Sequence, residues 1–200
     1  MIETNLLNSD LLIECYKVGI FPMANSREDK EVFLVDPEER GIIPVNGLHI
    51  SKSLKKFIKN MNYRITIDNS FNEVIKKCAE PKNTRGETWI SHYIEKLYCE
   101  LYYEGYAHSI EVWENNNLVG GIYGLAIGGA FFGESMFSDK LNASKVALVK
   151  LVDQLNKKKF ILLDTQFMTK HLQSMGGIKI KRDEYHKLLN NALNISTEFI

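Results

Sequence analysis

Two groups of polar residues in this 200-residue chain could carry out acyl-transfer chemistry. Glu134 ends a glycine-rich apolar run, residues 118–133, in which glycines allow a ligand to approach the backbone and apolar side chains would line a pocket. Asp164 and Gln166 follow the apolar segment Phe160–Leu163, which the pattern predicts as a buried strand. In an extended backbone these two side chains point the same way. A carboxylate beside an amide can accept protons from an amine and orient a carbonyl, as acyl transfer to an amine requires.

Each group also has a purely structural interpretation. The run 118–133 carries no charge before Glu134, so it could be a membrane span, although its six glycines favour turns and bulges over a continuous helix. It could also be a buried hairpin with bulges. Asp164 and Gln166 could form a hydrogen-bonding device at a strand end. The residue types by themselves leave these alternatives open.

The charge pattern limits how the chain could meet a nucleic acid. The 25 basic residues balance the 25 acidic ones, so a polyanion would have to be met by a local patch. One candidate is a helix that we expect Ser51 to cap, with apolar residues on one face and lysines on another. Those lysines either contact a phosphate backbone or form an ordinary solvated face. They are Lys52, Lys55, Lys56 and Lys59.

Cysteines and histidines indicate no metal site. The chain has three cysteines, Cys15, Cys78 and Cys99, without a CxxC spacing, which is typical of reduced thiols in the cytoplasm. The histidines show no paired ligand spacing. The first residues are acidic and no signal-type apolar segment follows them, so we expect a cytoplasmic protein.

The expected elements follow an α+β order around a mixed sheet. We expect a small N-terminal lobe over residues 1–60, which includes the basic helix, and a catalytic domain over 61–200. The lobe begins with a helix capped by Ser9 or Asp10 and contains an apolar island at Val32–Val35. The domain is predicted to contain strands at 63–67, 109–113, 118–137, 160–163 and 178–182, helices at 71–78, 91–103, 142–155, 171–175 and 183–193, and a polar loop at 80–88 before Trp89. This is the order of the acetyltransferase-like (GNAT-type) fold.

Eight short motifs appear in one order between about residue 11 and residue 186, and together they resemble the leucyl/phenylalanyl-tRNA protein transferases. They are Gly19-Ile20-Phe21-Pro22, Leu48-His49-Ile50-Ser51, Thr88-Trp89-Ile90, Ala107–Trp113, Leu118-Val119-Gly120-Gly121, Phe132–Ser138, Asn142-Ala143-Ser144-Lys145 and Asp164-x-Gln166.

The resemblance implies a specific activity. Members of that family transfer leucine or phenylalanine, with methionine as a further candidate, from aminoacyl-tRNA to the N-terminal arginine or lysine of acceptor proteins. The peptide bond creates an N-degron that marks the acceptor for proteolysis. Their fold is a small lobe on an acetyltransferase-like domain. No metal or small cofactor is implied, because the tRNA ester is already activated. We also expect a monomer with no membrane partner.

The resemblance also assigns residues. Asp164, Gln166 and Glu134 match the catalytic positions, where positioning and charge stabilisation are favoured over a proton relay. Ile122, Phe131, Met136, Leu151 and Leu163 match the pocket for the amino-acid side chain, although all five could be plain core. Trp89 matches a tryptophan near the terminal adenosine of tRNA. The usual tryptophans of the small lobe are absent: Met23 follows Gly-Ile-Phe-Pro, and Phe33 stands where a second stacking residue would be.

Two other functions remain possible from the residues. An acyl-CoA-dependent N-acetyltransferase could share the fold, but we find no glycine-arginine pyrophosphate loop before a helix. A non-catalytic tRNA-binding module could use the lysine helix alone and would show no turnover.

Overall fold

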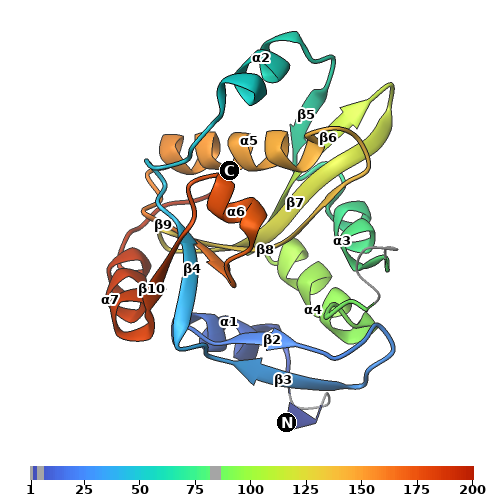
Figure 1. Cartoon of the computed structure of the whole chain (residues 1–200). Coiled ribbons are helices and arrows are strands. Elements are labelled where there is room, and N and C mark those ends of the chain that lie inside the picture. The colour runs from blue at the N-terminus through green and yellow to red at the C-terminus, as the bar shows by residue number, and fades with distance from the viewer. Residues whose placement is uncertain (1, 4–6, 82–86) are drawn as a thin grey trace.

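A seven-stranded mixed sheet and a three-stranded sheet organise the chain (Figure 1). The computed structural model describes residues 2–3, 7–81 and 87–200, so parts of the expected acidic start and of the expected polar loop at 80–88 lie outside the described residues. The small sheet has the order β1-β3-β2 and the large one β10-β4-β9-β8-β7-β6-β5. The strands are β1 (Ile2–Glu3), β2 (Phe21–Met23), β3 (Glu31–Val35), β4 (Glu39–Ile43), β5 (Arg64–Ile67), β6 (Ala107–Glu114), β7 (Asn117–Ile127), β8 (Ala130–Ser138), β9 (Leu162–Gln166) and β10 (Ile178–Lys181).

The large sheet has the predicted α+β character. Its neighbouring strands are antiparallel except for β8 and β9, which run parallel and are joined through helix α5 (Ala143–Lys157). Strands β5 to β8 are antiparallel, and β9 follows α5 and pairs parallel with β8. This is the acetyltransferase-like order that the sequence predicted. The parallel pair matters for function, because the chain leaves both strands at the same edge of the sheet.

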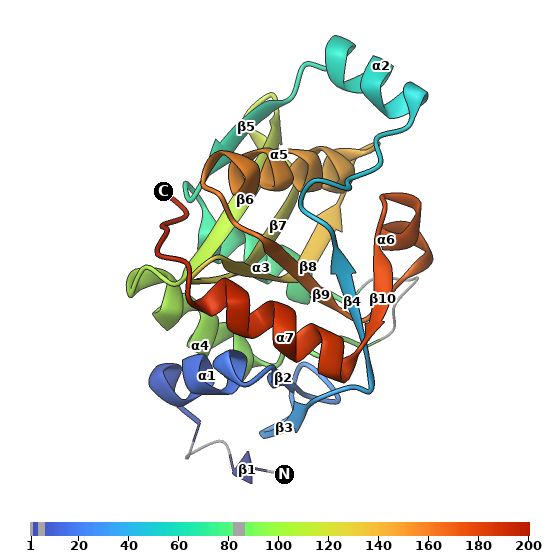
Figure 2. The same cartoon turned by 90° about the vertical axis from the view of Figure 1, so that its left-hand side faces the viewer.

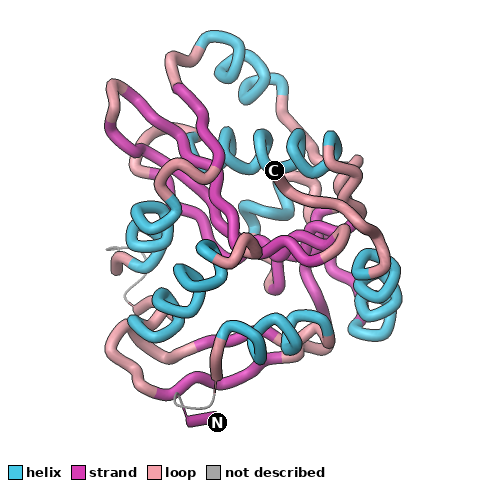
Figure 3. The backbone as a smooth tube through the Cα atoms, turned by 180° about the vertical axis from the view of Figure 1, so that it is seen from behind, coloured by secondary structure: helices cyan, strands magenta, loops and turns pink. Residues whose placement is uncertain are grey.

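Helices cover both faces of this sheet. Helix α5 lies on one face, while α3 (Phe71–Ala79) and α4 (His92–Tyr103) lie on the other (Figures 1 and 3). The alternation along the strands explains the two cores: Phe131 joins the α5 side and its neighbour Phe132 joins the α4 side. Helices α1 (Ser9–Lys17) and α7 (Arg182–Leu193) extend the second layer (Figure 2), and α2 (Lys52–Asn60) and α6 (Lys170–Ser174) complete the helices.

The glycine-rich run 118–133 forms the β7–β8 hairpin, so the buried-hairpin interpretation is confirmed and the membrane span is wrong. Its glycines permit close packing: a Cβ on Gly120 would lie 2.5 Å from the Cβ of Ala143 in α5, and one on Gly124 would lie 2.1 Å from the Phe132 carbonyl oxygen. Among the described residues, no helix combines the length and apolarity needed to cross a bilayer.

The local helix predictions mostly agree with the structure. Ser51 caps α2 by accepting the Leu54 amide (3.2 Å), and Ser91 caps α4 by accepting the Ile94 amide (3.3 Å). The cap of α1 is Asn8 rather than Ser9 or Asp10, because the Asn8 side chain accepts the Leu11 amide at 2.8 Å. The Leu11 side chain lies on the outer face of this helix and is 41% exposed. Strand β4 falls within the residues assigned to the small lobe, yet it pairs with β9 and β10 of the large sheet.

Candidate active site

A cavity of about 260 Å³ lies between the ends of β8 and β9, strand β2 and helix α6. Its apolar wall contains Ile122, Met136, Leu148, Leu163 and Leu172. Pro22, Met23 and Trp89 form another side, and Phe167, which is 46% exposed, also borders the cavity. Glu134, Gln166, Thr165 and His171 contribute its polar groups. The cavity therefore joins a large apolar surface to a few polar side chains, as ligand pockets commonly do.

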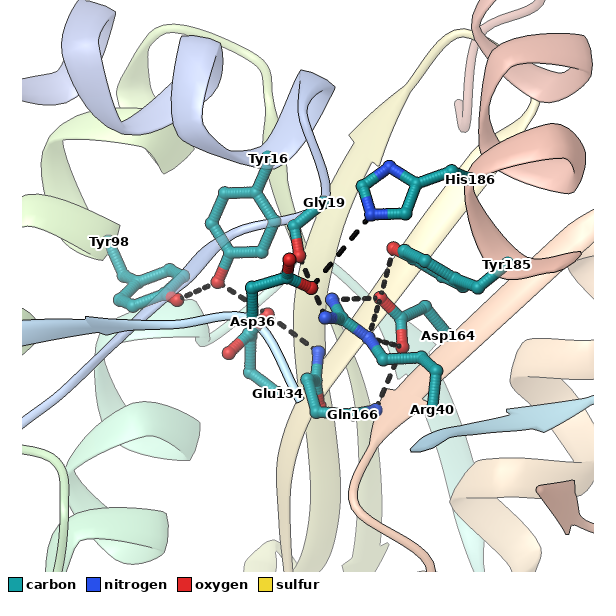
Figure 4. Close-up of polar contacts among 10 residues, drawn as sticks. All are labelled: Tyr16, Gly19, Asp36, Arg40, Tyr98, Glu134, Asp164, Gln166, Tyr185 and His186. Atoms are coloured by element: carbon teal, nitrogen blue, oxygen red, sulfur yellow. Dashed lines mark hydrogen bonds and ion pairs between the residues drawn. The ribbon is translucent and has the colours of Figure 1, made fainter. Parts of the chain in front are cut away.

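Glu134 contributes a carboxyl group to the lining of this cavity, and Figure 4 shows its polar contacts. Its Oε1 accepts hydrogen bonds from the Tyr16 hydroxyl at 2.7 Å and from Gln166 Nε2 at 3.2 Å, and Tyr16 is in turn hydrogen-bonded to Tyr98. Burial raises the pKa of Glu134 from 4.5 to about 8, with a smaller raising effect from Asp164, while the tyrosine hydrogen bonds partly oppose the rise. This carboxyl can therefore gain or lose a proton near neutral pH.

Asp164 lies in a different environment, behind the cavity. Its carboxylate accepts hydrogen bonds from Arg40 Nε (3.0 Å) and Nη2 (2.7 Å), from the Tyr185 hydroxyl (2.7 Å) and from the Gln166 amide (2.8 Å). The Arg40 side chain is buried between the rings of Phe21 and Tyr185, at 4.6 and 4.3 Å from their centroids. The Asp164 carboxylate is thus fully engaged within the protein and does not border the cavity.

The expectation that Asp164 and Gln166 point the same way is wrong, because the backbone is not extended at Gln166. Its φ is +52°, in the left-handed region. The Asp164 side chain accepts the amide of Gln166, which curls the chain at the end of β9 in an Asx-type turn. Leu163 and Thr165 reach the cavity by ordinary strand alternation, whereas Gln166 enters it through this turn and meets Glu134.

The other candidate residues divide between the cavity and its surroundings. Ile122, Met136, Leu163 and Trp89 border the cavity. Three candidates do not: Phe131 is buried with its ring 5.1 Å from that of Phe199, Leu151 is buried in α5, and Phe33 lies on β3 opposite Met23. Cross-strand partners share a face, so Phe33 is one strand removed from the cavity.

The lysine helix α2 projects from the end of the molecule that carries α5, opposite β3 and α1 (Figure 1). Leu54 is its buried residue, and its lysines, Lys52, Lys55, Lys56 and Lys59, are all exposed. In the described part of the chain, no carboxylate forms an ion pair with any of them. Their positive charge is therefore available to a partner from outside.

Sequence reasoning missed four residues of the site: Tyr16, Tyr98, Arg40 and Tyr185. Tyr16 and Tyr98 carry a signal only in helical periodicity, which marks them as core. Arg40 stands among charged residues and looks exposed, yet it is completely buried. In the described residues, no group of three or more His, Cys, Asp or Glu side chains is arranged to hold a metal ion.

The fold and the cavity define an acyltransferase-type site, in which an acetyltransferase-like sheet presents an ionisable carboxyl and an amide to an apolar pocket. Comparison with known proteins identifies the particular family within this class. Residues 42–190 match the family model described as leucyl/phenylalanyl-tRNA protein transferase, and residues 5–38 match the N-terminal domain model of the same family.

Curated relatives agree over nearly the whole chain. The leucyl/phenylalanyl-tRNA--protein transferase of Rhodospirillum rubrum is 49% identical over 96% of this chain and 91% of its own length. The one from Ruegeria sp. is 50% identical over 97% of this chain and 90% of its own length. The chain therefore belongs to the leucyl/phenylalanyl-tRNA protein transferase family, and it is an aminoacyltransferase.

Solved structures show only partial likeness. A ribosomal-protein-alanine N-acetyltransferase from Brucella melitensis biovar Abortus 2308 has a TM-score of 0.35 and 13% identity over 49% of this chain and 76% of that chain. A conserved protein of unknown function from Bacteroides thetaiotaomicron VPI-5482 has a TM-score of 0.46 and 11% identity over 80% of this chain and 57% of that chain.

Proposed function

We propose that this enzyme transfers leucine or phenylalanine, with methionine as a third donor, from aminoacyl-tRNA to the N-terminal arginine or lysine of acceptor proteins. The acceptor amine attacks the ester carbonyl, the C–N bond forms, and the C–O bond to the terminal ribose breaks. The amine loses a proton and the ribose oxygen gains one. The observation that carries the proposal is the apolar cavity with an ionisable carboxyl and an amide at its wall.

The donor side chain would lie against Ile122, Met136 and Leu163. These residues form a wall without a charged group, so a charged side chain would lose its hydration without replacement. An aliphatic or aromatic side chain unbranched at Cβ would fit best, because a branch at Cβ would crowd the wall beside the ester. Phe131 and Leu151, from the adjoining core, would support this wall from behind.

Glu134 and Gln166 would act directly on the reacting groups. Glu134 would bind the amine of the aminoacyl or acceptor end and exchange its proton, which a pKa near 8 supports. The Gln166 amide would orient the amine or the ester carbonyl. Asp164 would be a positioning residue, since its carboxylate holds the Gln166 amide and the Arg40 guanidinium rather than facing the cavity.

The tRNA would be bound at two places. Trp89 would offer its ring to the terminal adenosine. Phe33 pairs with Met23 one strand away from the cavity, so it would contribute only where the nucleotide extends past Met23. The four lysines of α2 would contact the phosphate backbone of the tRNA body. We also infer that the enzyme is a monomer in the cytoplasm. The three free cysteines support the cytoplasmic location.

Transfer of labelled leucine from Leu-tRNA to a peptide with N-terminal arginine tests the proposal. Competition among Leu-, Phe-, Met- and Ile-tRNA at a fixed concentration of that peptide gives the donor ranking, and the same peptide starting with alanine gives the acceptor preference. We expect Ile-tRNA to be the poorest donor and the alanine peptide to be inert. Acetyl transfer from acetyl-CoA without aminoacyl transfer would overturn the proposal, and so would tRNA binding without turnover.

Charge reversal on α2 tests the tRNA surface. The double variant Lys55→Glu/Lys56→Glu should weaken tRNA binding about tenfold or more and flatten its salt dependence, because fewer counterions are released. Transfer from aminoacyl-adenosine, which has no backbone, should stay nearly unchanged. A matched control, Lys157→Glu/Lys187→Glu, reverses two exposed lysines on α5 and α7. Equal loss with both donors would contradict this surface.

A further inference from the structure

The loop after β2 is fastened to the segment that carries Trp89. Residues 24–30 join β2 to β3, and residues 88–91 lead into α4. Ala24 donates its amide to the Trp89 carbonyl at 3.1 Å, and His92 donates its amide to the Arg27 carbonyl at 3.1 Å. These bonds place the loop of the small sheet directly against the backbone of Trp89.

Arg27 adds a side-chain clamp to these backbone bonds. Its Nη1 donates to the Ile90 carbonyl at 3.0 Å, and its Nη2 forms an ion pair with Glu95 in the first turn of α4. One guanidinium therefore joins three elements: the β2–β3 loop, the residue after Trp89 and helix α4. Its planar fork suits this task, because it fixes direction as well as distance.

The Arg27–Glu95 pair is largely shielded from water, which distinguishes it from ordinary surface pairs. The two side chains are 20% and 12% exposed, whereas those of the Lys96–Glu100 pair on the same helix are 69% and 42% exposed. Surface pairs contribute little to stability, while partly buried charges hold their geometry more firmly. Lys96–Glu100 is thus a natural internal control.

We propose that the Arg27–Glu95 pair is a positioning device for the nucleobase side of the cavity. It locks the β2–β3 loop, whose preceding strand supplies Pro22 and Met23 to the cavity, against the segment that supplies Trp89. These walls are then preformed before the donor arrives, so binding does not have to order them. The inference rests on the proposed contact between Trp89 and the terminal adenosine.

The expected defect is in binding rather than in chemistry. Arg27→Met keeps the length of the side chain but removes the guanidinium, so the Trp89 segment keeps its two backbone bonds to the loop and loses the side-chain clamp. KM for aminoacyl-adenosine and for aminoacyl-tRNA should both rise about tenfold, while kcat changes less than about threefold. This pattern differs from that of the α2 lysines, whose loss should affect the tRNA donor alone.

Three variants and one spectroscopic measurement test the inference. They are Arg27→Met, the exchanged pair Arg27→Glu/Glu95→Arg, and the control Lys96→Met. Kinetics use both donors, with thermal melting to show that each variant is folded. Because the chain has two tryptophans, a Trp113→Phe background isolates Trp89, whose fluorescence and acrylamide quenching report on its surroundings. If Arg27→Met does not fold, Glu95→Gln takes its place.

We expect Arg27→Met to raise KM for both donors and to increase the quenching of Trp89. The exchanged pair should restore at least part of KM and of the quenching, and Lys96→Met should change neither KM nor quenching. Unchanged quenching and KM in Arg27→Met, or a loss confined to kcat, would overturn it. These results are separate from failure of the proposed function, which would appear as absence of aminoacyl transfer by the unmutated enzyme.

Discussion

Two carboxyl groups near the same edge of the sheet, buried Asp164 and half-buried Glu134, have opposite surroundings. Asp164 is held by Arg40, Tyr185 and the Gln166 amide, while Glu134 has hydroxyl and amide donors on one oxygen and faces the cavity. The pKa of Glu134 is raised to about 8, chiefly by burial. Burial by itself therefore does not place a carboxyl at the cavity. The Arg40 guanidinium holds Asp164 in internal contacts, whereas Glu134 forms no ion pair among the described residues and borders the cavity.

The largest effect should come from breaking the Asp164 cluster. Arg40→Met leaves the Asp164 carboxylate buried without its cation, so the free energy of unfolding should fall by about 3–5 kcal/mol, measured by urea denaturation. Tyr185→Phe is the matched control, because it removes a single hydroxyl from the same carboxylate and should cost about 1 kcal/mol. A loss below about 1 kcal/mol for Arg40→Met would show that the cluster is not what holds β4 to β9.

Removing the exchangeable proton of Glu134 should affect activity instead. Glu134→Gln keeps the shape of the side chain but cannot exchange a proton, so kcat/KM for aminoacyl-adenosine should fall about 100-fold. The free energy of unfolding should stay the same or rise, since the folded protein no longer has to keep a proton that the unfolded chain releases at neutral pH. Asp164→Asn, by comparison, should lose both activity and stability. Equal losses of stability in the two variants would remove the distinction between the two carboxyls.

The smallest effect, taken per pH unit, is the slope of the free energy of unfolding with pH. Folded Glu134 keeps its proton up to about pH 8, whereas in the unfolded chain it releases it near the ordinary value of 4.5. The folded state thus binds more protons between these values, and stability falls as pH rises, by up to about 1.4 kcal/mol per pH unit. Urea denaturation at pH 5.5, 6.5 and 7.5 should show this slope relative to Glu134→Gln. Parallel curves for the two proteins would contradict the raised pKa.

Much of the fold follows from local patterns. Ser51 and Ser91 were identified as helix caps or starts because a hydroxyl before an amphipathic segment satisfies a free amide. The glycines between Leu118 and Gly133 favoured a hairpin over a helix, and close contacts with Ala143 and Phe132 show why they are needed. The predicted cap of α1, Ser9 or Asp10, is one or two residues after the observed cap Asn8, because all three residues are good caps and only the backbone selects among them.

The candidate site was predictable in part. Glu134, Gln166, Trp89 and three of the pocket residues meet at one cavity, as the motifs implied. Arg40 could not be found, because a buried arginine is recognisable only from its aromatic and carboxylate neighbours. Phe131 and Leu151 could not be separated from the cavity wall, since pocket and core residues have the same apolar character.

The sequence by itself determined the family, the α+β order of elements and the residue types available for catalysis, because motifs, caps and hydrophobic periodicity are local properties. Only the tertiary structure decided which carboxyl faces the cavity. Asp164 and Glu134 are both acidic residues beside apolar strands, and their difference comes from groups distant in the chain: Arg40 and Tyr185 around one, Tyr16 and Tyr98 beside the other. A pKa depends on the distance and solvation of charges in space, which spacing along the chain does not specify.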